Sequence, residues 1–168
     1  MGKGTAKRII SHAIIVIVAY LLQAAFFSGL KVGGAAPLIL PLVAVGIGLF
    51  DGGLWGGIWG VICGLLCDVS LTDSGTLFTI FLAIAGFFTG FLSEFVLARG
   101  FPSFFTVSTV TLVLSALLQM AGPFFYRGAP FSALWKPALI QTVYSALFIL
   151  PVYYPIHRAT RSTRRVRI

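Results

Sequence analysis

The carboxylates are the leading candidates for chemistry in this chain. A charged side chain in an apolar segment costs free energy, so its presence there often indicates a function. The four acids are Asp51, Asp68, Asp73 and Glu94. Two-carboxylate catalysis or a metal site would require several of them to converge. Apolar segments separate them, and we expect these segments to distribute the acids over both surfaces of a membrane. The acids therefore predict no shared active site.

The other reactive side chains do not form a recognisable constellation either. His12 and His157 lie at opposite ends of the chain, while Cys63 and Cys67 lie four residues apart in one apolar segment. On a helix that spacing separates Cβ atoms by about 5–6 Å, which is wider than a disulfide favours, and it lacks the two-residue gap of a zinc pair. No serine-hydrolase elbow, zincin motif or phosphate-binding loop occurs. We predict neither catalysis, nor a metal, nor a cofactor.

Glycine has a spacing that indicates close helix packing. Gly56, Gly60 and Gly64 recur every four residues, and Gly86 and Gly90 repeat the spacing in the next apolar segment. Residues four apart share a helix face, and small residues let helices approach closely in lipid. The pattern is typical of internal packing of a bundle. Internal packing is the favoured interpretation, but docking of a transmembrane helix from a partner can occur on a different face, and we predict that docking role for these five glycines.

Each glycine row ends in an acid one turn further on, which predicts a polar anchor near a membrane surface. Asp68 follows Gly64, and Glu94 follows Gly90. We expect Asp68 near the outer surface, as a headgroup-level anchor or a partner of Lys31 or Arg127. We expect Glu94 near the inner surface, paired with Arg99.

A row of polar side chains marks the last two apolar segments. Its members share a helix face within each segment: Ser108, Thr111, Ser115 and Gln119, then Gln141 and Ser145. Polar faces in a membrane point towards neighbouring helices or a wet cavity. We favour hydrogen bonds between helices, with Gln119 and Gln141 as polar anchors, over a small-molecule cavity.

The elements that carry all these residues are long apolar segments. Hydrophobic residues make up 58% of the 168 residues and charged residues 10%. About 20 apolar residues span a bilayer core, and lipid offers the backbone no hydrogen-bond partner, so each segment should be helical. We predict an all-α integral membrane protein, a single domain over residues 1–168 with about six transmembrane helices. The spans lie near residues 9–30, 35–50, 54–71, 76–98, 103–125 and 134–157.

The second and third spans have an alternative. Residues 35–50 are few and include Pro37 and Pro41, while residues 54–71 are rich in glycine. These two segments could form a re-entrant hairpin instead of two full crossings. The chain ends would lie on the same side of the membrane in either case.

Basic residues gather at the two ends of the chain and account for most of its net charge of +8. They are Lys3, Lys7, Arg8, Arg158, Arg161, Arg164, Arg165 and Arg167, with residues 158–168 forming a basic tail. The bias towards positive charge on the cytoplasmic side predicts that both termini are cytoplasmic. The immediate partner of this charge is anionic phospholipid rather than nucleic acid.

One region resembles a known family. Residues 56–68 form a glycine-spaced segment ending in Gly-Leu-Leu-Cys-Asp, followed by Gly75 and the Gly86-x-x-x-Gly90 segment. This arrangement resembles the MreD family, the rod-shape-determining membrane proteins of bacteria, and the similarity extends over nearly the whole chain. One departure is that many members carry an acid after the proline that opens the second span, whereas Leu38 follows Pro37 here.

The resemblance implies a non-catalytic role in the bacterial cytoplasmic membrane. Members associate with MreC, a single-span protein, and through it with MreB, RodA and the transpeptidase partner of RodA. Their fold is similar to the substrate-binding subunits of energy-coupling-factor transporters. We therefore expect a scaffold of the cell-elongation complex that supports cell shape and peptidoglycan synthesis. The alternative is a vitamin-type binding subunit of such a transporter, and an intramembrane enzyme acting on lipid ranks third.

Overall fold

Seven helices occupy the part of the chain that the computed structural model describes, which is residues 3–29, 37–70, 76–95, 100–127 and 131–164. Their bounds are α1 Lys3–Gly29, α2 Leu40–Asp51, α3 Gly53–Ser70, α4 Leu77–Phe95, α5 Phe101–Arg127, α6 Phe131–Leu147 and α7 Ile149–Arg164. Within these ranges four helices, α1, α3, α4 and α5, contain stretches long and apolar enough to cross a membrane. The bent pair of α6 and α7 would make a fifth span. The fold is therefore an all-α bundle suited to a multi-pass membrane protein.

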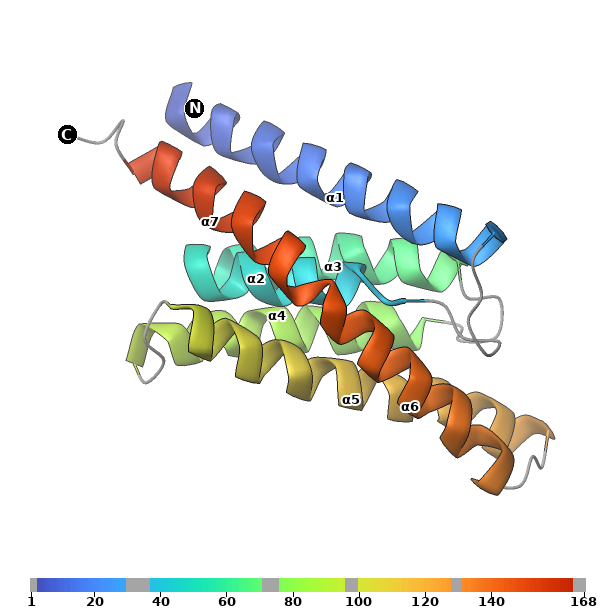
Figure 1. The fold of residues 1–168 in the computed structure, drawn as a ribbon. Coiled ribbons are helices and arrows are strands. Elements are labelled where there is room, and N and C mark those ends of the chain that lie inside the picture. Colours follow the sequence, from blue (N-terminus) through green and yellow to red (C-terminus); the bar gives the residue numbers. More distant parts are fainter. Residues whose placement is uncertain (1–2, 30–36, 71–75, 96–99, 128–130, 165–168) are drawn as a thin grey trace.

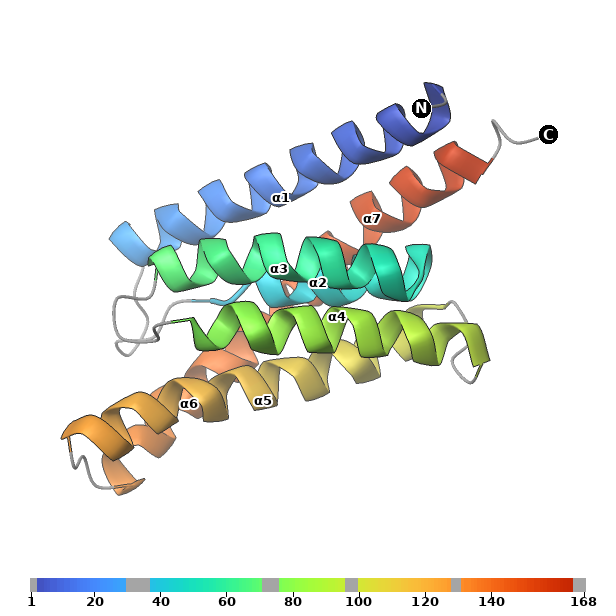
Figure 2. The ribbon, with the colours of Figure 1, turned by 180° about the vertical axis from the view of Figure 1, so that it is seen from behind.

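The short helix α2 lies at the centre of the bundle. Figure 1 shows α7 crossing in front of it, and Figure 2, from behind, shows α3 and α4 on its other side. Every residue from Leu38 to Phe50 is buried, and α2 packs on α1, α3, α4, α5 and α7. A helix that is apolar all round is a buried helix. The core of this protein is therefore built around α2.

Apolar side chains on the outer helices face away from this core. On α1, for example, Ile10, Ile14 and Leu21 are 57–60% exposed. In water such a surface would drive aggregation, whereas in lipid it is the expected exterior. The start of α1 and the end of α7 lie at the same end of the bundle (Figures 1 and 2).

The predicted second and sixth spans differ from single crossing helices. The second consists of residues 37–39, which are not helical by hydrogen bonding, followed by a helix of 12 residues with proline in its first turn. The sixth bends by 41° between α6 and α7. Pro151 has no N–H with which to bond the Leu147 carbonyl. Phe148 N donates to Ser145 O at 3.0 Å, three residues back, whereas a regular α-helix bonds the residue four back.

The glycines of α3 and α4 lie inside the bundle. Gly56, Gly60, Gly64, Gly86 and Gly90 are all buried, and a Cβ at any of them would collide with the backbone of a neighbouring helix. At one point three helices meet through glycine alone, because Gly48 of α2 lies against Gly56 and Gly86. Sequence reasoning did not single out Gly48.

This packing corrects the docking role that we predicted for the five glycines. The face is filled by the protein's own backbone, so a partner helix has no access to it in this structure. Close approach of α3 and α4 yields dispersion contact that bulky side chains would prevent. Of the two roles considered for the pattern, internal packing is the one these glycines have.

Replacing Gly60 with alanine should destabilise the protein by about 1–3 kcal/mol, the usual cost of an overpacked contact. The added methyl group would overlap the backbone of Leu82, which cannot move without shifting α4. The free energy of unfolding in detergent, measured by SDS titration, gives the effect.

Gly57→Ala is the matched control for Gly60→Ala. It makes the same change on the same helix, but its methyl group would meet the Cβ atom of Phe87 at an ordinary 3.5 Å. Equal stabilities of the two variants would contradict the packing described.

Candidate functional site

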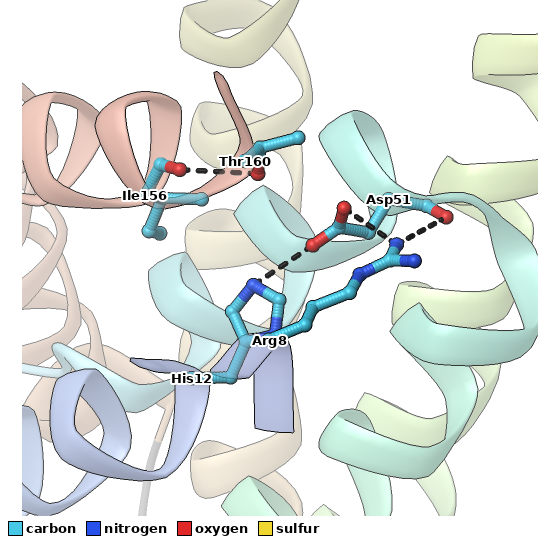
Figure 3. A network of polar contacts seen from close by, with 5 residues as sticks. All are labelled: Arg8, His12, Asp51, Ile156 and Thr160. Atoms are coloured by element: carbon cyan, nitrogen blue, oxygen red, sulfur yellow. Dashed lines mark hydrogen bonds and ion pairs between the residues drawn. The ribbon is translucent and has the colours of Figure 1, made fainter. Parts of the chain in front are cut away.

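An ion-pair cluster joins the first two helices near the end of the bundle where α1 begins. Figure 3 shows Arg8 and His12 of α1 reaching Asp51, the last residue of α2. Arg8 Nη2 lies 2.5 Å from Asp51 Oδ1, and His12 Nε2 lies 2.8 Å from Asp51 Oδ2. The histidine contact has ion-pair distance without the alignment of a hydrogen bond. We call these three residues the Asp51 cluster.

The Asp51 cluster is buried, so the Asp51 carboxylate needs a cationic partner for the fold to be stable. The Asp51 side chain is 4% exposed, that of His12 1% and that of Arg8 21%. A buried carboxylate without a partner is strongly unfavourable. Asp51 also lies at the C-terminal end of α2, where the helix dipole disfavours negative charge.

Arg8 offsets both effects. Its Nη2 also donates to the backbone carbonyl of Asp51 at 3.1 Å, so a single guanidinium group contacts the carboxylate and the end of the helix. Nearby on α7, the Thr160 hydroxyl donates to the Ile156 carbonyl at 3.1 Å, which leaves that hydroxyl bonded within its own helix.

Two tryptophans of α3 complete the surroundings of the Asp51 cluster. The Arg8 guanidinium carbon lies 4.7 Å from the centre of the Trp55 ring, a cation–π contact. The His12 ring meets Trp59 edge-on, with ring centres 5.8 Å apart. The cluster therefore connects α1, α2 and α3.

A second group of polar contacts holds the other end of α2. Gln23 Oε1 accepts from the backbone N–H groups of Ile39 at 2.9 Å and Leu40 at 3.1 Å. Ser145 Oγ accepts from Leu38 N at 2.9 Å. Helix N-termini leave N–H groups without intrahelical partners, and here side chains of α1 and α6 supply the acceptors.

Asp68 has a structural contact that we did not predict. Its carboxylate accepts from Phe78 N at 3.1 Å, from Thr79 N at 2.9 Å and from the Thr79 hydroxyl at 2.6 Å. A carboxylate at a helix N-terminus is favoured by the free N–H groups and by the helix dipole. Asp68 therefore ties the end of α3 to the start of α4.

The expected partners of both acid anchors fall where the structure gives no account of them. Lys31 and Arg99 lie outside the described residues, and the side chain of Arg127 is not described. Glu94 is exposed near the end of α4, so its pairing with Arg99 stays a prediction.

In the polar row of α5 and α6, one hydrogen bond joins the two helices. Gln141 Nε2 donates to Gln119 Oε1 at 3.3 Å. Ser108 and Ser115 are fully buried, yet their hydroxyl groups and Gln119 Nε2 lack a hydrogen-bond partner. The row thus combines one interhelical bond with several buried polar atoms that have none.

The basic residues have several different settings. Lys7 and Arg158 are exposed, whereas Arg8 is half-buried in the Asp51 cluster. Lys3 begins α1, Arg164 ends α7 and Arg161 lies in the last turn of α7, all without a described side chain. Arg165 and Arg167 lie outside the described residues. Arg8 is therefore more than a membrane-surface charge.

Sequence reasoning missed the Asp51 cluster and Gln23. The residues Asp51-Gly52-Gly53 are typical of a turn, but Asp51 is the last residue of α2 and the chain turns only at Gly52, which has a positive φ of 99°. The available signal was the four-residue spacing of Arg8 and His12, which places two potential cations on one face of an apolar helix. Among the residues that the structure describes, no three His, Cys, Asp or Glu side chains gather where they could hold a metal ion.

Comparisons with known proteins return no family model, no curated protein and no solved structure that matches this chain.

Arg8→Leu should lower the free energy of unfolding by about 3–5 kcal/mol, because it leaves Asp51 buried without its main partner. The double variant Arg8→Leu, Asp51→Leu should recover most of that loss, because it removes both charges together. A double-mutant cycle in detergent measures the coupling.

Lys7→Leu is the matched control, since it removes one cation from an exposed neighbouring position and should change stability by no more than about 0.5 kcal/mol. Additive losses from Arg8→Leu and Asp51→Leu would contradict the role given to the pair.

Proposed function

We propose that this protein is a non-catalytic scaffold subunit of the bacterial cell-elongation complex, supporting cell shape and peptidoglycan synthesis. The observation that carries the proposal is the use made of its buried polar side chains. Asp51 pairs with Arg8 and His12, Asp68 caps α4, and Gln23 caps α2. Groups that could do chemistry elsewhere are here engaged in holding helices together. The MreD resemblance of residues 56–90 supplies the biological setting.

The surface available to a partner is the exposed apolar side of α3 and α4, which does not include the five buried glycines. Large apolar side chains there are 37–76% exposed, and on α4 Phe87, Phe91 and Phe95 follow one another along one face. Their ring centres are 6.5 and 5.0 Å apart. We call these three residues the phenylalanine ridge.

The phenylalanine ridge suits a transmembrane helix that presents small residues. Helices in lipid gain little from apolar burial and associate through shape and close packing. The glycine contacts behind the ridge fix α3 against α4, so the ridge is presented on a firm support. We infer that an MreC-like single-span helix docks here, and that MreB, RodA and its transpeptidase are reached through that partner.

The proposed scaffold function also implies a location. We propose the bacterial cytoplasmic membrane, six crossings and both termini in the cytoplasm. The positive-inside bias of the basic ends supports this orientation, and so does the position of the start of α1 and the end of α7 at one end of the bundle.

Phe91→Ala should reduce co-purification of the MreC-like partner about tenfold, a loss of about 1.4 kcal/mol, because it removes an exposed ring from the middle of the phenylalanine ridge. Co-purification from the native bacterium in mild detergent, with quantification of both proteins, measures the loss. Cells that carry only this variant should lose their rod shape.

Phe105→Ala on α5 is the matched control, because Phe105 is 48% exposed and Phe91 is 49% exposed. Unchanged recovery of the partner with Phe91→Ala, or an equal loss with Phe105→Ala, would contradict docking at the phenylalanine ridge.

A second candidate function rests on the polar row of α5 and α6. The hydroxyl groups of Ser108 and Ser115 and the amide nitrogen of Gln119 are buried without partners, and unpaired buried groups of this kind can mark a site for an absent ligand or water. This favours a vitamin-type binding subunit of an energy-coupling-factor transporter as the alternative.

For that alternative, the purified protein should carry a bound vitamin that mass spectrometry of the denatured sample detects. Ser115→Ala should lower its occupancy several-fold, because one hydrogen bond is worth about 1 kcal/mol, and an ATPase should co-purify. Ligand-free protein with an intact MreC-like partner would exclude this function and leave the scaffold.

A further inference from the structure

Three buried nitrogen atoms around the Asp51 cluster have no hydrogen-bond acceptor. They are Arg8 Nε, His12 Nδ1 and Trp59 Nε1. The arginine and tryptophan nitrogens always carry a hydrogen, and the histidine nitrogen carries one when the ring is protonated. Buried donors of this kind destabilise a fold unless something accepts their hydrogens. The arrangement therefore lacks an acceptor.

The three nitrogens belong to side chains that bridge α1 and α3 in two adjacent contacts. Arg8 lies over Trp55, and one turn further along both helices His12 meets Trp59. Figure 2 shows α1 diverging from α3 towards its N-terminal end, so that these side chains connect helices that otherwise barely touch. We call the four residues the α1–α3 bridge.

Asp51 accepts none of these three hydrogens in the structure, because its Oδ1 pairs with Arg8 Nη2 and its Oδ2 lies 2.8 Å from His12 Nε2 without making a hydrogen bond. An oxyanion has the chemistry that the α1–α3 bridge lacks, since it accepts several hydrogen bonds and is attracted by guanidinium and imidazolium groups. Lys7 is exposed beside Arg8 and adds further positive charge. The charged side chains at the bridge are thus Arg8 and Asp51, and Lys7 is next to Arg8 in the sequence.

The surroundings of the α1–α3 bridge fit a lipid. Leu54 and Ile58 of α3 lie within one helical turn of Trp55 along the chain, Ile10 of α1 lies within one turn of Arg8, and all three are exposed. These apolar side chains would accompany acyl chains, while tryptophan and arginine are suited to the level of the headgroups. The Arg8 side chain, 21% exposed, is the part of the bridge that a headgroup would meet first.

We propose that the α1–α3 bridge binds the phosphate group of an anionic phospholipid, which accepts hydrogen bonds from Trp59 Nε1, Arg8 Nε and His12 Nδ1. Such a lipid would connect α1 to α3 where their own side chains make few contacts. The site is independent of the proposed scaffold function, because no partner protein takes part in it.

Trp59→Phe tests the site, because it removes the indole N–H and keeps an aromatic ring. The full chain, purified in detergent, is titrated with phosphatidylglycerol, phosphatidylcholine or inorganic phosphate. Native mass spectrometry and the thermal midpoint report binding. Wild type should bind phosphatidylglycerol in preference to phosphatidylcholine, and Trp59→Phe should bind it about tenfold more weakly, the loss expected for one charge-assisted hydrogen bond. Trp135→Phe, on the distant helix α6, should bind as wild type does.

A second measurement does not depend on the folding of the Trp59 variant. Wild-type protein with ¹⁵N-labelled tryptophan is placed in nanodiscs of either lipid, and the indole signals are assigned with Trp55→Phe and Trp135→Phe. The Trp59 Nε1–H signal should shift when phosphatidylglycerol replaces phosphatidylcholine, while the Trp135 signal stays in place.

Three results would overturn the proposal. One is equal binding of phosphatidylglycerol by wild type and Trp59→Phe together with an unmoved Trp59 signal. Another is the same stabilisation from inorganic phosphate as from the lipid, which would make the occupant a free anion. The third is that neither phosphatidylglycerol nor inorganic phosphate changes the thermal midpoint, in which case buried water satisfies the three nitrogens. Loss of the MreC-like partner with lipid binding intact would affect only the scaffold proposal.

Discussion

The structure depends on the need to end a short helix inside a membrane protein. Helix α2 has 12 residues, so it is about 18 Å long, well short of a hydrocarbon core of about 30 Å. Its free N–H and C=O groups cannot be left to lipid. Gln23 supplies acceptors at one end and Arg8 a donor at the other. These residues lie 15 positions apart on α1, about 22 Å along a helix, so an antiparallel α1 can reach both ends of α2.

The middle of α2 obeys a different constraint, which is space. Its side chains are buried on all sides, so α3 and α4 must approach it closely without polar contacts to guide them. Gly48, Gly56 and Gly86 remove the side chains at the point of contact. Polar side chains thus determine where α2 ends, and glycines determine how closely it is surrounded. Because Asp51 is the last residue of the buried helix α2, its carboxylate is buried too and must be paired with Arg8 and His12.

Apolar length alone predicted α1, α3, α4 and α5, because a run of some 20 apolar residues has few other solutions in a bilayer. It could not distinguish a helix buried in protein from one facing lipid, so the central position of α2 was missed. The glycine spacing predicted close packing but not which helix would fill the groove. The Asp51 cluster joins positions 43 residues apart, a separation that no local pattern reports. Pro151 was a signal for the bend at Phe148, but we predicted residues 134–157 as one span.

The distribution of polar contacts also limits where function can reside. Helix α1 has an exposed apolar face, and that face gives it little reason to prefer protein over lipid. Its attachment therefore depends on the Gln23 contacts and the Asp51 cluster, which bond it mainly to α2. Between α1 and α3 the contacts are sparse and donors lack acceptors. Helix α3, by contrast, is fixed to α4 through glycines along its length.

A partner helix gains most from binding to the closely packed α3–α4 pair, because little conformational entropy is lost there on binding. A lipid gains most on the α1–α3 side, where it completes unsatisfied hydrogen bonds. The two proposed surfaces thus follow from one difference in packing on the two sides of α3.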